Sequence, residues 1–358
     1  MRAEILRTDT IFSGSGRLGG YFWPSVARLA DGSVMAVSSG SRLAHLCPFG
    51  RLTVAYSKDE GKHWSKEKRL LSTGTDERDA GLCVFGKDVY VTTFNNTMQA
   101  QKQFCELMSW DEETQILIDK RLKENEEAID RNLGSFLLYG DGYDFSEPKR
   151  IPLTTPHGPF VFNGGVALVG RAFPYYSENS EMYLRDGIYF MSLNKTDFGK
   201  PRLIVPQGEN GYNLYEPHAV TLNNGDILLA VRAERNGDVR DGGLFTILTC
   251  VSKDGGETFS PLEETGIEGS PPHLYSVDGN IVMTYGRRKF PFGIRAKITK
   301  DGKSWSDELI VRNDGIDFDL GYPSTCSLKD GSLYTVYYMK SKKNANSKVY
   351  GTKWRITN

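Results

Sequence analysis

The sequence has no surplus of either charge: 44 Lys and Arg residues face 45 Asp and Glu residues, which leaves a net charge of −1. Nucleic-acid-binding proteins usually carry a basic surplus, so we expect no nucleic-acid partner. The chain also contains no apolar run of the length that crosses a bilayer, about 18 residues or more. We therefore expect no membrane span.

Cysteine is scarce, and the members of this small set are scattered: Cys47, Cys83, Cys105, Cys250 and Cys326. They lack the paired spacings of zinc sites or disulfide frameworks, which predicts free, buried thiols in a reducing compartment. The first residues include no apolar stretch typical of a signal peptide. We therefore expect a cytoplasmic protein, and we expect neither a cofactor nor a metal ion. A secreted protein whose signal peptide had been removed would show the same features, so it is the alternative.

Glycine and aromatic residues are abundant, with 38 Gly, 18 Tyr and 18 Phe, a composition typical of many short strands and turns. A pattern of strand, Gly-containing turn and second strand recurs along the chain. Its copies begin at Pro24, Ala80, Pro159, Pro217, Pro272 and Pro323. The spacing leaves room for two further strands in each copy. The repeat predicts an all-β, six-bladed propeller of four-stranded antiparallel blades, which fills residues 1–358 as one domain.

A second repeated motif agrees with this fold. Segments of the form S-x-D-x-G-x-x-W/F, known as Asp-boxes, begin at Ser57 and Ser252, a shortened copy begins at Thr299, and a degenerate one at Gly140. The Asp is expected to bind turn amides and the aromatic residue to pack beneath the turn. We assign these residues to structure rather than to catalysis.

The stretch from about residue 100 to 133 interrupts the repeat and is rich in charge, for example at Asp111–Glu113. We interpret it as an insertion, either an extended hairpin or a helical excursion with a solvated face. A rim for the site or a subunit contact is the alternative, and the oligomeric state is not predicted.

In a propeller, the starts of the innermost strands and the ends of their partners meet at one end of the axis. In this chain those positions carry arginines, carboxylates, tyrosines and histidines, among them Trp23, Asp79, Glu216, Arg232 and Tyr322. Several arginines at one place need anionic partners, either protein carboxylates or a bound acid. A carboxylated sugar fits such a pocket.

Two segments resemble the sialidase (neuraminidase) superfamily of Asp-box propellers: Glu216–Arg232, with a Glu before the strand and an Arg after its partner, and the segment that begins Gly321-Tyr322-Pro323. The resemblance implies that Tyr322 is the nucleophile and Glu216 its base. It also implies that Arg232, with Arg287 or Arg288, binds the carboxylate of the substrate. A neutral Tyr hydroxyl avoids the repulsion that an anionic nucleophile would meet beside that carboxylate.

Two features of the family are missing. Sialidases begin the first inner strand with Arg-Ile-Pro, whereas this chain has Phe22-Trp23-Pro24, and Arg42 is the nearest replacement for the arginine. The following loop also lacks the family's acidic proton donor. His45 in that loop and Asp79 on the next blade are the candidate proton donors, since an imidazole can act as an acid near neutral pH.

Four of the five histidines fall near the predicted site: His45, His157, His218 and His273. We take His218 and His273, which occupy matching repeat positions, together with Trp23 as substrate contacts. A metal site is the less favoured interpretation, because no closely spaced ligand motif is present.

We therefore predict a sialidase-like exo-glycoside hydrolase that removes a terminal acidic sugar, such as sialic acid, from a glycan partner. A polysaccharide lyase acting on uronate-containing glycans with the same residues is one alternative, because His and Arg can supply its base and its neutralising charge. A non-catalytic carbohydrate-binding propeller is the other.

Overall fold

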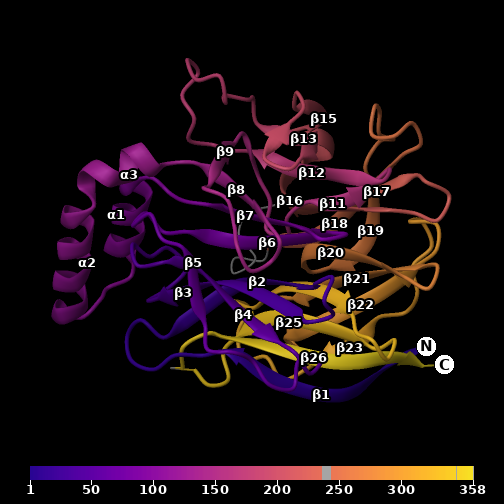
Figure 1. Ribbon diagram of the computed structural model, residues 1–358, viewed down its shortest axis with the longest axis horizontal. Helices are drawn as coiled ribbons and strands as arrows, with labels where there is room; N and C mark the ends of the chain where they lie inside the picture. Colours follow the sequence, from indigo (N-terminus) through magenta and orange to yellow (C-terminus); the bar gives the residue numbers. More distant parts are fainter. Residues whose placement is uncertain (236–242, 344, 358) are drawn as a thin grey trace.

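Six antiparallel sheets surround a common axis in the computed structural model, which describes residues 1–235, 243–343 and 345–357 (Figure 1). The first strand of each blade lies innermost, because these strands contact one another around the ring. The all-β, six-bladed propeller predicted from the repeat is confirmed.

From the axis outward, the first two blades consist of β2 (Gly20–Arg28), β3 (Val34–Arg42), β4 (Arg51–Ser57) and β5 (Lys68–Leu71), then β6 (Arg78–Phe85), β7 (Asp88–Phe94), β8 (Ser135–Gly140) and β9 (Lys149–Ile151). In the third blade, two short strands share the inner position and two share the outer one. Its strands are β10 (Leu153–Thr154), β11 (Phe160–Phe162), β12 (Gly165–Ala172), β13 (Gly187–Asn194), β14 (Asp197–Phe198) and β15 (Arg202–Pro206).

A short 3-10 helix (Glu209–Gly211) leads into the fourth blade. The fourth and fifth blades consist of β16 (Asn213–Thr221), β17 (Ile227–Arg235), β18 (Leu244–Ser252) and β19 (Glu263–Glu268), then β20 (Ser270–Val277), β21 (Asn280–Arg287), β22 (Gly293–Thr299) and β23 (Leu309–Arg312). The sixth blade contains β24 (Gly321–Ser327), β25 (Leu333–Met339), β26 (Lys348–Thr357) and β1 (Arg2–Phe12).

The ring is closed by the first strand of the chain. β1 pairs with β26 in antiparallel register, with Arg2 opposite Thr357, so both ends of the chain lie together at one edge of the sixth blade (Figure 1). The outermost strand of the last blade therefore comes from the opposite end of the sequence, and it holds the first and last blades in one ring.

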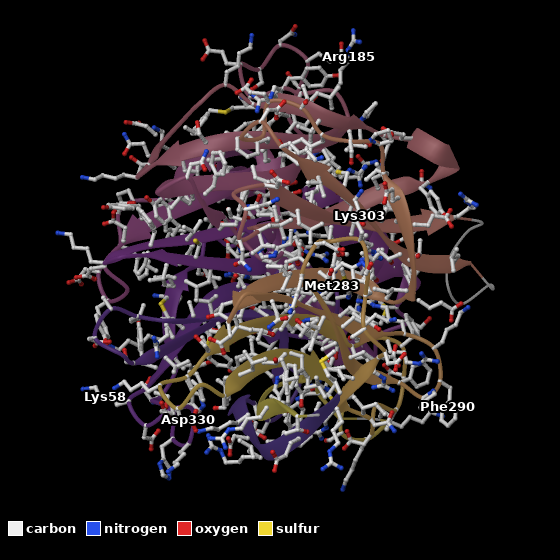
Figure 2. The ribbon with its side chains drawn as sticks, turned by 90° about the vertical axis from the view of Figure 1, so that its right-hand side faces the viewer. Lys58, Arg185, Met283, Phe290, Lys303 and Asp330 are labelled. Atoms are coloured by element: carbon white, nitrogen blue, oxygen red, sulfur yellow. The ribbon has the colours of Figure 1, made fainter. Side chains whose placement is uncertain are left out.

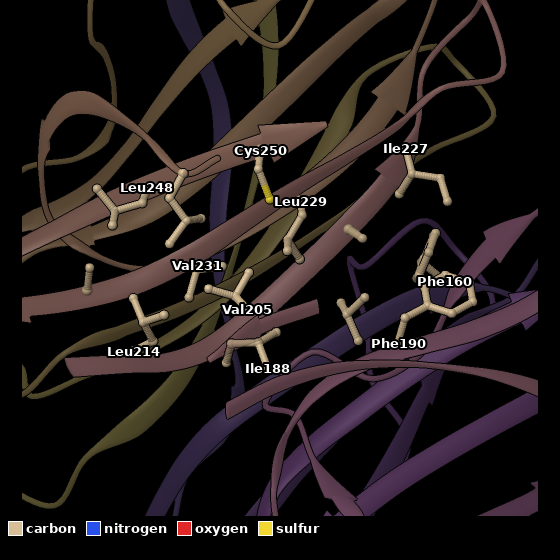
Figure 3. Packing of buried hydrophobic residues seen from close by; sticks show 14 of the residues in the cluster. Phe160, Ile188, Phe190, Val205, Leu214, Ile227, Leu229, Val231, Leu248 and Cys250 are labelled. Atoms are coloured by element: carbon tan, nitrogen blue, oxygen red, sulfur yellow. The ribbon is translucent and has the colours of Figure 1, made fainter. Parts of the chain in front are cut away.

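The core lies between the blades rather than within a single layer. Leu214, Val231 and Ile188 come from blades three and four and point toward one another across that interface (Figure 3). Because blades cover both faces of the middle strands, these strands are continuously apolar instead of alternating. Side chains fill the interior around Met283, which is fully buried, whereas Phe290 at the edge is 81% exposed (Figure 2).

The charged insertion is helical. Its helices are α1 (Met98–Leu107), α2 (Glu112–Glu124) and α3 (Glu126–Asn132), which stand beside the ring (Figure 1). Thr97 and Asp111 cap the first two, and a small core that includes Ile118 and Leu122 packs against Phe49 of the first blade. Within the residues that the structure describes, no helix is long and apolar enough to cross a membrane.

The Asp-box segments form turns between the third and fourth strands of their blades. In the first blade, Asp59 accepts hydrogen bonds from the amide of His63 at 2.9 Å and from the hydroxyl of Ser57 at 2.9 Å. Trp64 of the same segment packs on Tyr334, with ring centroids 6.2 Å apart. Asp254 and Asp301 make equivalent bonds in blades four and five.

Candidate active site

A β-bulge interrupts the inner strand near its start in blades one, two, four, five and six. In four of them the bulged residue has a positive φ, between 44° and 49°: Trp23, Asp79, Glu216 and Tyr322. Such a backbone conformation destabilises the folded protein by about 1–3 kcal/mol for each residue that adopts it. A bulge also changes the direction in which the side chain of the bulged residue points. We call the end of the axis where these residues gather the mouth.

A phenol and a carboxylate meet at the mouth. The hydroxyl of Tyr322 donates a hydrogen bond to Oε1 of Glu216 at 2.5 Å. Arg232, which lies in β17 opposite Tyr215, contacts Oε2 of Glu216 at 2.6 Å and the Tyr322 oxygen at 3.3 Å. Its other side binds Glu234 at 2.8 Å. Three residues that the sequence placed together are therefore in direct contact, although Glu216 and Tyr322 lie 106 positions apart.

Burial and charge set the protonation states of this pair. Burial raises the pKa of the Tyr322 hydroxyl well above its usual value, and the charge of Glu216 raises it further, so the phenol is neutral near neutral pH. Burial alone would raise the pKa of Glu216, but the charge of Arg232 and the hydrogen bond from Tyr322 bring that pKa below its usual value. Glu216 is therefore an ionised acceptor for the Tyr322 proton.

Asp79 from the second blade has the opposite character. It is 3% exposed, and Oδ1 has no hydrogen-bond partner among the described residues. Burial raises the pKa of Asp79 to about 7; Arg78 opposes the shift, and the charge of Glu216 adds to it. The mouth thus contains one carboxyl group that keeps its proton up to about neutral pH and one that is ionised, an arrangement typical of an acid and base pair.

Two arginines at the mouth have nitrogen atoms without partners. Arg288 is 8% exposed, its Nη2 has no hydrogen-bond partner within the described ranges, and its guanidinium lies 5.6 Å from the centre of the Tyr322 ring. Arg78 is 9% exposed, its Nε is likewise without a partner there, and it stacks 4.3 Å over Trp23. Buried N–H groups of this kind gain most from an anionic ligand.

The other two predicted arginines, Arg42 and Arg287, are paired with protein carboxylates. Arg42 is fully buried and forms an ion pair with Asp76, and it also binds Ser39 at 2.7 Å, so its donors are already used. Arg287 pairs with Glu308 at 3.5 Å. Trp23 is fully buried between the guanidinium groups of Arg42 and Arg78, and it supports the site from beneath the surface.

His157, His218 and His273 form a cluster with ring centroids 4.5 to 5.6 Å apart: the rings of His218 and His273 stack, and His157 stands edge-on to both. The ring of His157 lies 6.4 Å from that of Tyr322. Burial lowers the pKa of each ring, so all three are neutral. His218 and His273 line an axial cavity of about 460 Å³. They are 4% and 6% exposed and lie in the inner strands two positions past Glu216 and Pro271. In the described part of the chain, no group of ligating side chains has the geometry of a metal site.

His45 lies at the rim of the mouth, with its ring 4.9 Å from that of Trp23, and Nδ1 is 3.7 Å from Asp319. The sequence analysis missed Asp319, and it also missed Asp76 as the partner of Arg42. A signal for both was present: each lies three positions before a bulged residue, Asp76 before Asp79 and Asp319 before Tyr322.

No protein-family model matches the chain, and no curated protein matches it. Among solved structures, a protein of unknown function from Dyadobacter fermentans is similar over 99% of both chains, with a TM-score of 0.73 and 18% identity. The leech intramolecular trans-sialidase matches 98% of this chain and 70% of its own, with a TM-score of 0.63 and 13% identity. The α-L-arabinofuranosidase Arb93A of Fusarium graminearum matches over 98% of both chains, with a TM-score of 0.62 and 13% identity.

At these identities the likeness is one of fold. The sialidase-type architecture expected from the sequence is confirmed at that level, and the named neighbours include two kinds of glycosidase. The chain has the six-bladed propeller fold that sialidases and this arabinofuranosidase share.

Proposed function

We propose that the protein is a glycoside hydrolase that removes a terminal acidic sugar from a glycan. The observation that carries this proposal is the 2.5 Å hydrogen bond from the neutral Tyr322 hydroxyl to the ionised Glu216 carboxylate. A phenol that already donates to a base can lose its proton as its oxygen attacks the anomeric carbon. The glycosidase activities of two structural neighbours support the same reaction class.

The proposed step forms a bond between Tyr322 Oη and the anomeric carbon while the glycosidic C–O bond breaks. Glu216 accepts the phenol proton, and the departing oxygen takes a proton from an acid at the mouth. Water then attacks the anomeric carbon and gives a proton to the acid at the mouth. The bond between that carbon and the Tyr322 oxygen breaks, the free sugar leaves, and the Tyr322 oxygen recovers its proton from Glu216. No oxidant or cofactor is needed to balance this sequence.

The preference for an acidic sugar rests on the unpartnered nitrogen atoms of Arg288 and Arg78. A buried guanidinium without a full set of acceptors is costly, and a substrate carboxylate supplies acceptors in the geometry that arginine favours. Arg232 is already bound to Glu216 and Glu234, so it holds the base in place more directly than it meets the substrate. Protonated Asp79 can donate a hydrogen bond to the sugar.

The test is a screen of fluorogenic α-sialosides and uronides, followed by substitutions on any substrate that is cleaved. We expect Tyr322→Phe and Glu216→Gln each to lower kcat/KM at least about 100-fold, because each removes a group that takes part in bond making or proton transfer. Tyr334→Phe is the matched control, since that buried tyrosine lies in the same blade and binds the Gly61 carbonyl at 3.4 Å.

Full activity in Tyr322→Phe contradicts the proposed nucleophile. An unsaturated, ultraviolet-absorbing product contradicts hydrolysis and favours the lyase chemistry. Binding of an acidic sugar with no turnover by the unaltered protein, and with affinity retained in both variants, indicates a carbohydrate-binding propeller.

A further inference from the structure

A second polar cluster lies at the rim of the mouth, on the side of blades one and six. It consists of His45 from the loop between β3 and β4, Asp319 from the segment before β24, and Tyr338 from β25. The Nδ1 atom of His45 lies 3.7 Å from Oδ1 of Asp319, and the Tyr338 hydroxyl donates to the same oxygen at 2.6 Å. None of these groups is used by the Tyr322–Glu216 pair.

The surroundings hold Asp319 in one place. The amide of Asp319 donates to the side chain of Asp317 at 2.9 Å, while Tyr338 fixes the carboxylate from the other side. The ring of His45 stands edge-on to Trp23 at an interplanar angle of 87°. An imidazole whose Nδ1 faces an anchored carboxylate keeps its other nitrogen free for proton transfer, as in other His–carboxylate pairs.

This cluster is close to the nucleophile, and two of its members, His45 and Asp319, are more exposed than Tyr322, whereas Tyr338 is fully buried. The Tyr338 ring lies 5.9 Å and the Trp23 ring 6.3 Å from the ring of Tyr322. The His45 side chain is 37% exposed, whereas Asp79 and Tyr322 are each 3% exposed. In an exo-acting hydrolase the sugar lies deep and the departing group faces solvent, so the proton donor must reach the outer side of the bond.

We propose that His45 gives its proton to the departing group and that Asp319, anchored by Tyr338, is the positioning residue that orients its imidazole. This inference rests on the proposed function and assigns the leaving-group side of the same site. In it, His45 Nε2–H passes its proton to the glycosidic oxygen as the C–O bond breaks, and water restores the proton during the second step. Asp79 keeps its proton and stays with the buried sugar.

The charged groups facing His45 explain why a carboxylate is needed there. Desolvation by the protein around the ring lowers the pKa of His45, the nearby carboxylate of Asp319 opposes that fall, and the positive charges of Arg78 and Arg42 add to it, so the pKa stays below its usual value. Without Asp319 the imidazole would lose its proton at lower pH. The pKa of Asp319 itself is lowered: burial would raise it, but contacts with His45 and Tyr338 outweigh burial.

The first experiment needs no substrate. Imidazole ¹⁵N spectra of the full chain are recorded across a pH titration, and the His45 signals are assigned with His45→Gln. Asp319→Asn is expected to lower the pKa of His45, and Tyr338→Phe to lower it less. Asp314→Asn, which removes an exposed carboxylate paired with Arg312 in the same segment, is the matched control and should leave the His45 titration unchanged. An unaltered His45 pKa in Asp319→Asn overturns the pairing.

The second experiment compares leaving groups on the acidic sugar that the screen identifies. A 4-nitrophenyl glycoside needs little acid assistance, whereas a methyl glycoside needs a full proton transfer. Asp319→Asn is expected to lower kcat about 10- to 100-fold for the methyl glycoside and less than about 3-fold for the 4-nitrophenyl glycoside. Tyr322→Phe should slow both.

The two proposals fail in different ways. Equal effects of Asp319→Asn on both glycosides, or no effect on either, overturn the role of His45 and Asp319 while the Tyr322 mechanism stands. Unchanged turnover in Tyr322→Phe overturns the mechanism. If the screen finds no hydrolysis at all, the donor role falls with the proposed function, and the titration still decides whether Asp319 and His45 are paired.

Discussion

Because the three clustered histidines are neutral in the folded protein, we expect the free energy of unfolding to fall in acid. The contribution of His218 can be measured separately. Burial lowers the pKa of His218 to about 3, against about 6.5 for an unfolded histidine. Below about pH 6.5 the histidine of the unfolded chain binds a proton, whereas the buried ring of the folded protein does not. The contribution of this ring to the free energy of unfolding is therefore fully present above about pH 6.5 and is lost as the pH falls below it. Between pH 7 and pH 5 this ring alone costs about 2 kcal/mol of unfolding free energy.

Other groups titrate in the same window, which is why the prediction concerns a difference between two proteins. His157 and His273 act in the same direction, because burial lowers the pKa of each. Asp79 acts in the opposite direction, because its pKa is raised to about 7 and the folded protein keeps a proton that the unfolded carboxyl releases. Comparison of the wild type with one variant removes these shared contributions.

The variant is His218→Asn. The amide oxygen of Asn can replace Nδ1, which accepts a hydrogen bond from the Leu274 amide at 3.0 Å. Urea unfolding followed by tryptophan fluorescence at pH 7 and pH 5 should show that the variant loses about 2 kcal/mol less on acidification than the wild type. His63→Asn, at an 88% exposed side chain in an Asp-box turn, controls for the loss of one imidazole. Equal losses in wild type and His218→Asn refute the reasoning.

Three further predictions concern stability and are measured by urea unfolding at pH 7. Arg42→Met leaves the buried Asp76 carboxylate without its partner and should cost about 3–5 kcal/mol; a cost below 1 kcal/mol would show that the pair is not buried as described. Asp254→Ala removes the acceptor for Thr258 in the fourth-blade turn and should cost about 0.5–2 kcal/mol while activity is retained. Leu229→Ala opens a cavity between blades three and four and should cost about 2–5 kcal/mol, whereas an unchanged midpoint would contradict the close packing there.

The repeat was enough to predict the fold and to predict which residues, far apart in the sequence, lie together at the mouth. The copies beginning at Pro217 and Pro323 place Glu216 and Tyr322 at the same position of two blades, so the pseudosymmetry predicts that both lie at the mouth. Arg232 follows in the same way, because it lies in β17 opposite Tyr215, the residue before Glu216 in β16. The spacing of the repeats and the residues of their turns can be read directly from a single sequence, and these two features are enough to fix the blade order.

The partners of individual side chains were harder to predict. Arg42 had the right position to approach a substrate, but a carboxylate from the next blade, Asp76, captures its guanidinium. His218 and His273 lie only two positions after Glu216 and Pro271, but at that point the inner strands already line the axis. Both rings therefore line the axial cavity and cluster with His157. The loops differ between blades and do not follow the repeat. They determine which carboxylate pairs with an arginine and how deep a histidine ring lies along the axis, so the repeat could not predict these details.

Ring closure has a consequence for how this chain folds. The pairing of β1 with β26 joins the two ends of the sequence: Thr8 and Thr352, whose hydroxyl groups are 3.0 Å apart, are separated by 344 positions. Loop closure over such a length is slow, so five blades can assemble while β26 still presents a bare edge. Release of β1 from the finished ring exposes the edge of β26, and release of β26 exposes the edge of β25. In both cases the unpaired edge can pair with a strand of another chain, so attachment of the termini protects the sixth blade from self-association.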